Sequence, residues 1–136
     1  MFVTRIVAAR IRGARPDFAV LCYPVIQMGE PATHKGSQEN LLGTNPSPEL
    51  VERLSTEKQV TARTPPTFIF QTDADTGVPA ENAVSFYLAL RKAGVPAELH
   101  VYEKGEHGVG LAPHDRELST WPDRLLGWLR VNGWLQ

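Results

Sequence analysis

The sequence predicts an α/β fold in which about three parallel strands are flanked by helices. Three short apolar runs suit buried strands, and they lie at residues 17–23, 67–71 and 97–102. Stretches with helical periodicity alternate with these runs, as in parallel β-α-β units with right-handed crossovers. A parallel sheet is normally covered on both faces, and so few elements are expected to leave one edge of the sheet bare.

The first strand is predicted at DFAVLCY, residues 17–23, because this run is almost continuously apolar and is closed by Pro24. Residues 27–47 are rich in Gly, Pro, Asn, Ser and Thr, and we interpret them as one long loop. A short helix is predicted over residues 46–54, with Ser47 as its N-cap.

The second strand is TFIFQ, residues 67–71, and a polar turn follows it at residues 72–79. A helix is then predicted over residues 80–93, ended by Gly94 as a C-cap. Its apolar side chains recur at i, i+3, i+4 and i+7, and they are Ala83, Phe86, Tyr87 and Leu90.

The third strand, AELHVY at residues 97–102, alternates apolar and polar side chains, so we expect it to be less completely buried. A glycine-rich loop follows at residues 104–113. The last helix is predicted over residues 121–132, where Thr120 and Asp123 match a capping pattern.

The N-terminus is basic, because the first fifteen residues hold four arginines and no acid. A transit peptide is one interpretation, and a surface segment or the remainder of an element from a longer chain is the favoured one. We therefore divide the chain into a basic segment at residues 1–14 and a globular part at residues 15–136.

Composition excludes several classes of function. A net charge of −1 and the absence of a long apolar run predict no nucleic-acid partner and no membrane partner. The single cysteine, Cys22, rules out an internal disulfide framework, which fits a cytoplasmic protein without excluding a secreted one. The spacing of the four histidines predicts no zinc site.

Chemically suggestive side chains follow the second and third strands. Asp73 and Asp75 come after the second strand, and His107 comes after the third, between Gly105 and Gly108. Functional groups of open α/β sheets gather at the carboxyl ends of the strands, so an acid and an imidazole can meet there. The carboxylate would accept the imidazole N–H and stabilise the imidazolium during proton transfer.

These loops resemble those of α/β-hydrolases. The stretch PPTFIFQTDADTGVP, residues 65–79, is similar to their acid loop, and its D-x-x-V-P element implies Asp75 rather than Asp73 as the acid. The stretch LHVYEKGEHGVGL, residues 99–111, is similar to their histidine loop, which implies His107 as general base. The order acid then histidine agrees with the order Ser, Asp, His of this fold.

More narrowly, residues 15–135 resemble the esterase and acetylxylan-esterase-like branch, related to prolyl-oligopeptidase-type and dienelactone-hydrolase-like enzymes. The resemblance implies a carboxylesterase-like hydrolase of small esters, with acetylated sugars as candidate substrates. It implies Ser-His-Asp chemistry, with Asp75 and His107 as the catalytic residues present here, and no metal or organic cofactor.

The sequence departs from this family in one respect, because it contains no G-x-S-x-G. We therefore expect the chain to correspond to the C-terminal half of the fold, without the N-terminal strands and the nucleophile elbow, and to be inactive alone. Cys22 lies within a predicted strand and Ser37 lacks the elbow glycines, so neither is expected to replace the nucleophile.

Two alternatives remain open. One is a fragment of a prolyl-oligopeptidase-type serine peptidase, which shares this half of the fold. The other is a non-catalytic interaction module that binds a partner, or a second copy of itself, through the bare edge of the sheet.

Overall fold

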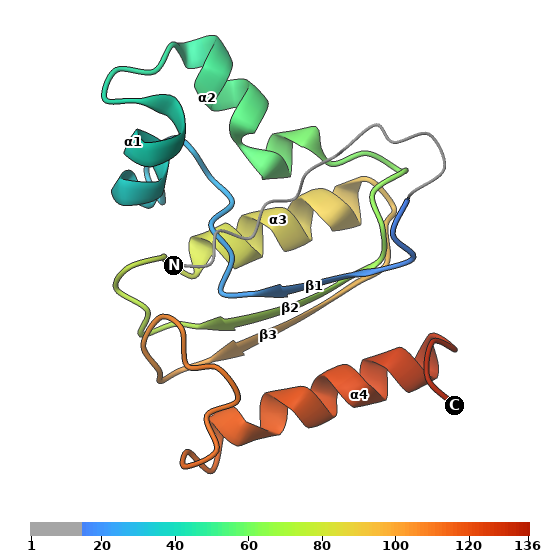
Figure 1. The fold of residues 1–136 in the computed structure, drawn as a ribbon. Helices are drawn as coiled ribbons and strands as arrows, with labels where there is room; N and C mark the ends of the chain where they lie inside the picture. The colour runs from blue at the N-terminus through green and yellow to red at the C-terminus, as the bar shows by residue number, and fades with distance from the viewer. Residues whose placement is uncertain (1–14) are drawn as a thin grey trace.

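The computed structural model describes residues 15–136, which form a three-stranded sheet between two layers of helix. Figure 1 shows α3 (Glu81–Lys92) over one face of the sheet and α4 (Trp121–Val131) under the other. The prediction of parallel strands with flanking helices is confirmed. The predicted basic segment, residues 1–14, lies outside the described residues.

The sheet contains β1 (Ala19–Cys22), β2 (Thr67–Thr72) and β3 (Ala97–Tyr102), all parallel and in the order β1-β2-β3. Every residue of the central strand β2 is buried, because strands flank it and helices cover both its faces. In β3, by contrast, five residues are half-buried and one is exposed, so the strand is less completely buried, as predicted. The exposed residue is the apolar Val101, which the alternating pattern does not predict. Among residues 15–136, β1 pairs only with β2, so its outer edge is bare.

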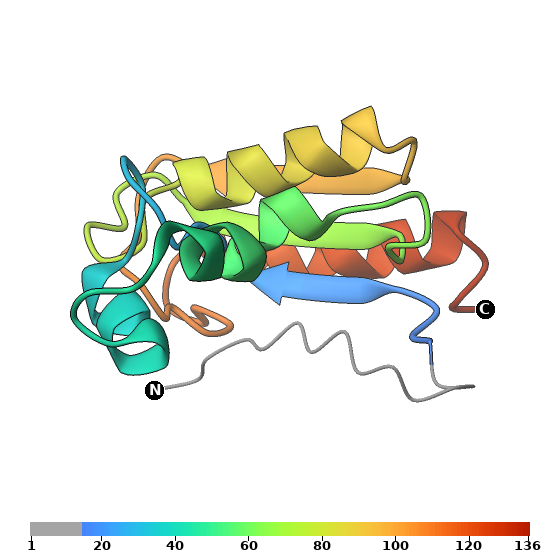
Figure 2. The same ribbon diagram turned by 90° about the horizontal axis from the view of Figure 1, so that it is seen from above.

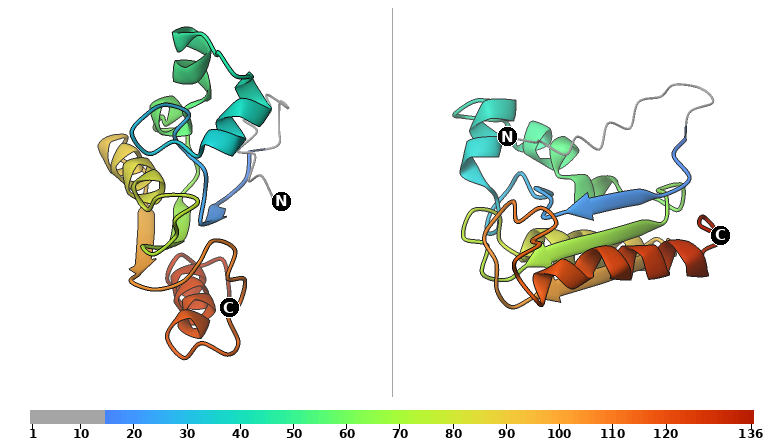
Figure 3. Two further views of the ribbon diagram at one scale, coloured as in Figure 1. Left: turned by 90° about the vertical axis from the view of Figure 1, so that its left-hand side faces the viewer. Right: turned by 60° about the horizontal axis from the view of Figure 1, so that its bottom comes forward.

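The side chains of β2 alternate between two hydrophobic clusters. Ile69 packs with Phe86 and Leu90 of α3 on one face, whereas Phe68 and Phe70 pack against α4 on the other. The best-aligned contact on the second face is Phe70 stacked on Trp121, with ring centroids 4.9 Å apart and an interplanar angle of 8°. Figure 2 looks down on the sheet from the side of α3, and the left view of Figure 3 looks along the strands, with the sheet between α3 and α4.

The predicted long loop at residues 27–47 is wrong in part, because α1 (Lys35–Leu42) forms within it. The Nδ1 atom of His34 caps this helix by accepting from the backbone N–H of Ser37 at 3.1 Å. No residue of α1 is buried, so its sequence carries no apolar stripe from which the helix could be recognised. The next helix, α2 (Pro48–Leu54), follows the predicted N-cap Ser47, and a 3₁₀ turn, η1 (Thr56–Gln59), precedes β2.

The last helix begins at Trp121 as predicted, but the side chain of Thr120 does not cap it. A 3₁₀ turn, η2 (Leu118–Thr120), runs directly into α4, and Thr120 is already helical, so its side chain caps no N–H group. Instead, the Thr120 hydroxyl donates to the Glu117 carbonyl at 2.6 Å and lies 2.9 Å from the hydroxyl of Tyr102. No helix in the described part of the chain is long and apolar enough to cross a membrane.

Candidate active site at the carboxyl edge of the sheet

The loops after β2 and β3 leave the sheet at the same end and lie side by side (Figure 3). They bring together Asp75 and His107, the two residues singled out in the sequence. The Nδ1 atom of His107 is 2.7 Å from Oδ2 of Asp75. The Asp75 side chain is fully buried, while 43% of the His107 side chain remains exposed to solvent. One member of the pair is thus shielded and the other is accessible.

Backbone groups orient the Asp75 carboxylate. Its Oδ1 atom accepts from the N–H groups of Gly77 at 2.9 Å and Val78 at 2.8 Å. This local turn is what the D-x-x-V-P spacing encodes, since Asp side chains readily bond to backbone N–H groups a few residues on. With Oδ1 occupied, Oδ2 faces His107.

The same geometry fixes the tautomer of His107. An ionised carboxylate can only accept hydrogen bonds, so the proton of the imidazole lies on Nδ1. Its Nε2 atom has no hydrogen-bond partner among residues 15–136. A neutral imidazole in this state presents the Nε2 lone pair outward, where it can take a proton from a hydroxyl.

Sequence reasoning missed Tyr23, which forms a wall beside His107. The ring centroids of Tyr23 and His107 are 5.0 Å apart with an interplanar angle of 68°, and Tyr23 also contacts Phe70 edge to face. Tyr23 has a φ of 40°, an uncommon conformation for a bulky residue. Its place at the end of the first strand is the only signal in the sequence.

A second missed residue is Asn82, which ties the segment after β1 to the acid loop. Its Oδ1 accepts from the N–H groups of Ile26 and Gln27, each at 2.9 Å. Its Nδ2 donates to the carbonyls of Ala32 at 2.7 Å and Pro79 at 3.1 Å. The fully buried amide therefore uses its whole hydrogen-bonding capacity, and it joins residues 26–32 to the start of α3.

The remaining acid and histidines lie apart from this pair. Asp73 is exposed, and its backbone N–H donates to the Tyr102 carbonyl at 2.7 Å. His34 caps α1, and His100 bonds to Glu98 of its own strand at 2.8 Å. No group of three or more His, Cys, Asp or Glu side chains that could hold a metal ion occurs among residues 15–136.

The two side chains considered as replacement nucleophiles are engaged elsewhere. Cys22 lies in β1, where burial raises the pKa of its thiol above the ordinary value. A raised pKa disfavours the nucleophilic thiolate. The Ser37 hydroxyl lies 2.9 Å from Nδ1 of His34, within the cap of α1.

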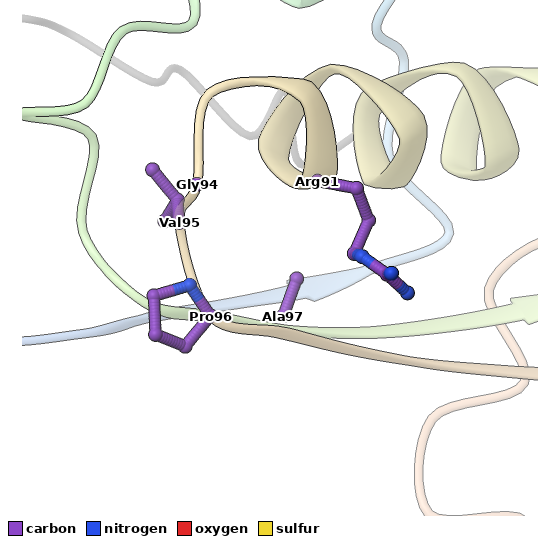
Figure 4. A pocket seen from close by; sticks show the side chains of 5 residues that line it. All are labelled: Arg91, Gly94, Val95, Pro96 and Ala97. Carbon is purple, nitrogen blue, oxygen red and sulfur yellow. The ribbon is translucent and has the colours of Figure 1, made fainter.

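A surface hollow of about 430 Å³ lies at the opposite end of the sheet (Figure 4). The end of α3 and the start of β3 line it, through Arg91, Gly94, Val95, Pro96 and Ala97. It holds no carboxylate or imidazole, and it is separate from the Asp75–His107 pair.

A carboxylate–imidazole pair at the carboxyl edge of a parallel sheet, with the acid and the base on successive strand-to-loop exits, defines part of an α/β-hydrolase. Comparison with known proteins agrees with this class. Residues 16–132 match the model of the prolyl oligopeptidase family, and the chain belongs to that family.

Two curated relatives match most of the chain. An acetylxylan esterase of Xylanibacter ruminicola is 37% identical over 118 residues, which cover 79% of this chain and 25% of that protein. Endo-1,4-beta-xylanase B of Butyrivibrio fibrisolvens is 45% identical over 107 residues, which cover 79% of this chain and 16% of that protein. The chain thus spans a quarter or less of the length of these relatives.

Solved structures show the same fold. An acetyl ester-xyloside bifunctional hydrolase from Caldicellulosiruptor lactoaceticus is 45% identical, with a TM-score of 0.87 over 90% of this chain and 44% of that one. The carboxylesterase Cest-2923 from Lactobacillus plantarum is 27% identical, with a TM-score of 0.74 over 90% of this chain and 46% of that one. The chain therefore has the fold of the α/β-hydrolase esterases and belongs to a family of hydrolases.

Proposed function

We propose that this chain contributes the acid and the general base of a serine esterase, with His107 as base and Asp75 as the residue that orients it. The 2.7 Å bond between Nδ1 of His107 and Oδ2 of Asp75 carries this proposal. The bond leaves Nε2 facing outward on a partly exposed ring, which is the state a general base requires.

The nucleophile in this proposal is a serine from polypeptide outside these 136 residues, because the sequence contains no G-x-S-x-G. The serine oxygen attacks the ester carbonyl while its proton passes to Nε2 of His107. The imidazolium, stabilised by Asp75, then returns that proton to the departing alcohol. Water completes the cycle in the same way and releases the carboxylic acid.

Acetyl esters of sugars are the proposed substrates. Two relatives support this choice by their names, an acetylxylan esterase and an acetyl ester-xyloside hydrolase, the latter at 45% identity over 90% of this chain. Because the chain covers only 44% of the second relative, these substrates are proposed for the complete enzyme and not for this chain alone.

A chimera tests the proposal. Residues 16–132 of this chain would replace the matching part of the Caldicellulosiruptor hydrolase, which supplies the rest of the fold. We expect the chimera to hydrolyse p-nitrophenyl acetate and acetylated xylo-oligosaccharides. His107→Ala should lower kcat by about 10³-fold or more, as loss of a triad member does. His114→Ala, which alters an exposed loop histidine, is the matched control and should retain activity.

Two outcomes would contradict this assignment. A folded chimera whose ester hydrolysis survives His107→Ala would exclude His107 as the base. Saturable ester hydrolysis by the 136-residue chain alone would show that a nucleophile lies within it. We expect no such turnover from the chain alone.

A serine peptidase is the second candidate, favoured by the match of residues 16–132 to the prolyl oligopeptidase family. The same chimera and the same His107 variant, assayed on proline-containing chromogenic peptides, distinguish the two. Peptide cleavage that exceeds acetyl-ester hydrolysis in kcat/KM would favour the peptidase.

A further inference from the structure

Gln71 is an exception within the apolar interior of the sheet. It lies near the end of β2 on the face that packs against α3, and its relative exposure is 0%. The residue two positions before it on the same face is Ile69, a member of the apolar cluster. A buried primary amide costs free energy unless its polar atoms are hydrogen-bonded, so its presence needs an explanation.

The surroundings of Gln71 determine which way its amide points. Its Nε2 atom lies 3.1 Å from the Thr72 carbonyl, 3.1 Å from the Val78 carbonyl and 3.4 Å from Oδ2 of Asp75. All three neighbours are acceptors. Turning the amide over would place its oxygen against two carbonyls and a carboxylate, so the NH₂ group must face the acid loop.

This orientation holds Val78 from both sides. The Val78 N–H donates to Oδ1 of Asp75 at 2.8 Å, while the Val78 carbonyl accepts from Gln71 at 3.1 Å. Gln71 therefore holds the residue whose N–H donates to Oδ1, and it also approaches Oδ2, the atom that bonds to His107. The chain of contacts runs from the middle of the sheet to the imidazole.

The hydrogen bonds of the Gln71 NH₂ group leave the other polar atom of the amide without a partner. The Oε1 atom of Gln71 is buried and has no hydrogen-bond partner among residues 15–136. An apolar side chain of the same length would avoid that penalty, at the expense of the donors aimed at the acid loop. The glutamine is therefore better explained by what its NH₂ group holds than by the stability of the sheet.

We propose that Gln71 is a positioning residue that holds the Asp75 carboxylate so that Oδ2 faces Nδ1 of His107. This inference rests on the proposed function for its catalytic meaning, but the contacts it concerns can be measured without catalysis. Without Gln71, only the N–H groups of Gly77 and Val78 hold the carboxylate, so we expect Oδ2 to shift away from His107 and the hydrogen bond at Nδ1 to be lost.

The test is NMR on the 136-residue chain with ¹⁵N-labelled histidine, which gives only four imidazoles to assign. In the wild type we expect His107 to show a protonated Nδ1 with a downfield, slowly exchanging proton. Gln71→Met keeps the length of the side chain and removes both donors, and we expect it to abolish that proton signal. Amide exchange at Val78 should also accelerate by roughly tenfold or more.

The matched control is Thr67→Val at the other end of the same strand. Thr67 is equally buried, and its hydroxyl donates to the Pro65 carbonyl at 2.9 Å. This variant also removes a side-chain hydrogen bond from β2, but we expect it to leave the His107 signal unchanged. A loss of signal in both variants would assign the effect to general loosening of β2 and overturn the proposal.

A wild-type measurement keeps the proposal falsifiable if Gln71→Met does not fold. The side-chain amide protons of Gln71 should exchange much more slowly than those of the exposed Gln59. Equal exchange rates, a wild-type His107 without a protonated Nδ1, or a Gln71→Met variant with the wild-type signal would each overturn the inference. Failure of the proposed function would appear separately, as a chimera that stays active after His107→Ala.

Discussion

Gly105→Ala tests how closely the histidine loop approaches the sheet. Gly105 has a φ of 122°, and a Cβ atom built there would lie 2.8 Å from Cγ2 of Thr72 and 3.0 Å from Cδ1 of Leu118. A backbone conformation of this kind costs a non-glycine residue about 1–3 kcal/mol. Crowding in a packed site adds about 1–3 kcal/mol. The expected loss in the free energy of unfolding is therefore about 2–6 kcal/mol, out of a typical total of about 5–15 kcal/mol.

The assay is urea unfolding followed by tryptophan fluorescence, since Trp121 and Trp128 both lie in the cluster under the sheet. Gly110→Ala is the matched control, because Gly110 has a φ of 59° and no atom within 4 Å of the added methyl group. That variant should lose only the cost of the left-handed conformation, about 1–2 kcal/mol. If the two variants lose the same free energy of unfolding, the close approach of the added methyl group at Gly105 does not affect stability, and this reasoning is refuted.

Three further predictions concern the supports of the site and the partly buried carboxylate of Glu57. Asn82→Ala leaves two backbone N–H groups without an acceptor and should cost about 2–5 kcal/mol in urea unfolding, against about 0.5 kcal/mol for Asn132→Ala at the end of α4. Tyr23→Gly removes the ring that packs against His107 and Phe70, so the chimera should lose stability and kcat, whereas Tyr23→Phe should retain both. A wild-type kcat in Tyr23→Gly would contradict this role. Burial raises the pKa of Glu57, so the stabilising contribution of the protonated side chain is complete below the ordinary value of 4.5 and is lost as pH rises through the raised pKa. Glu57→Gln should therefore increase the midpoint of thermal unfolding at pH 7 but not at pH 4. Equal shifts at the two pH values would argue against a buried carboxylate at this position.

The sequence predicts the strands well because their signal is local. A buried parallel strand needs an uninterrupted apolar run, and Phe68, Ile69 and Phe70 provide one. The helix α1 was not predicted because none of its residues is buried, and an exposed helix needs no apolar side chains at helical spacing. Thr120 occupies the predicted N-cap position of α4, but a 3₁₀ turn before the helix gives it a helical backbone, so its side chain makes no capping hydrogen bond.

The candidate site likewise contains residues that the sequence predicts and residues that it does not. Asp75 and His107 were predicted because their loops carry recognisable spacings, and the structure brings them within hydrogen-bond distance. Tyr23 and Asn82 were not predicted as parts of the site, since each acts through contacts between segments far apart in the sequence. Gln71 was not predicted because its partners are brought to it by the turn after β2, which its place in an apolar run does not reveal. Asn82, for example, bonds to a backbone group 56 residues away. Such partners become visible only when the chain is folded.

The Asp75–His107 pair arises within one β-α-β unit, β2-α3-β3, and the two residues are 32 positions apart. The acid, the base, the turn that orients the acid and the amide of Gln71 all lie between the start of β2 and the loop after β3. In the proposed function, a contiguous stretch of coding sequence therefore carries the proton-transfer half of the chemistry as one heritable block. Recombination can join that block to different neighbours, and substrate preference can then diversify in the adjoining segments while the geometry of proton transfer stays constant.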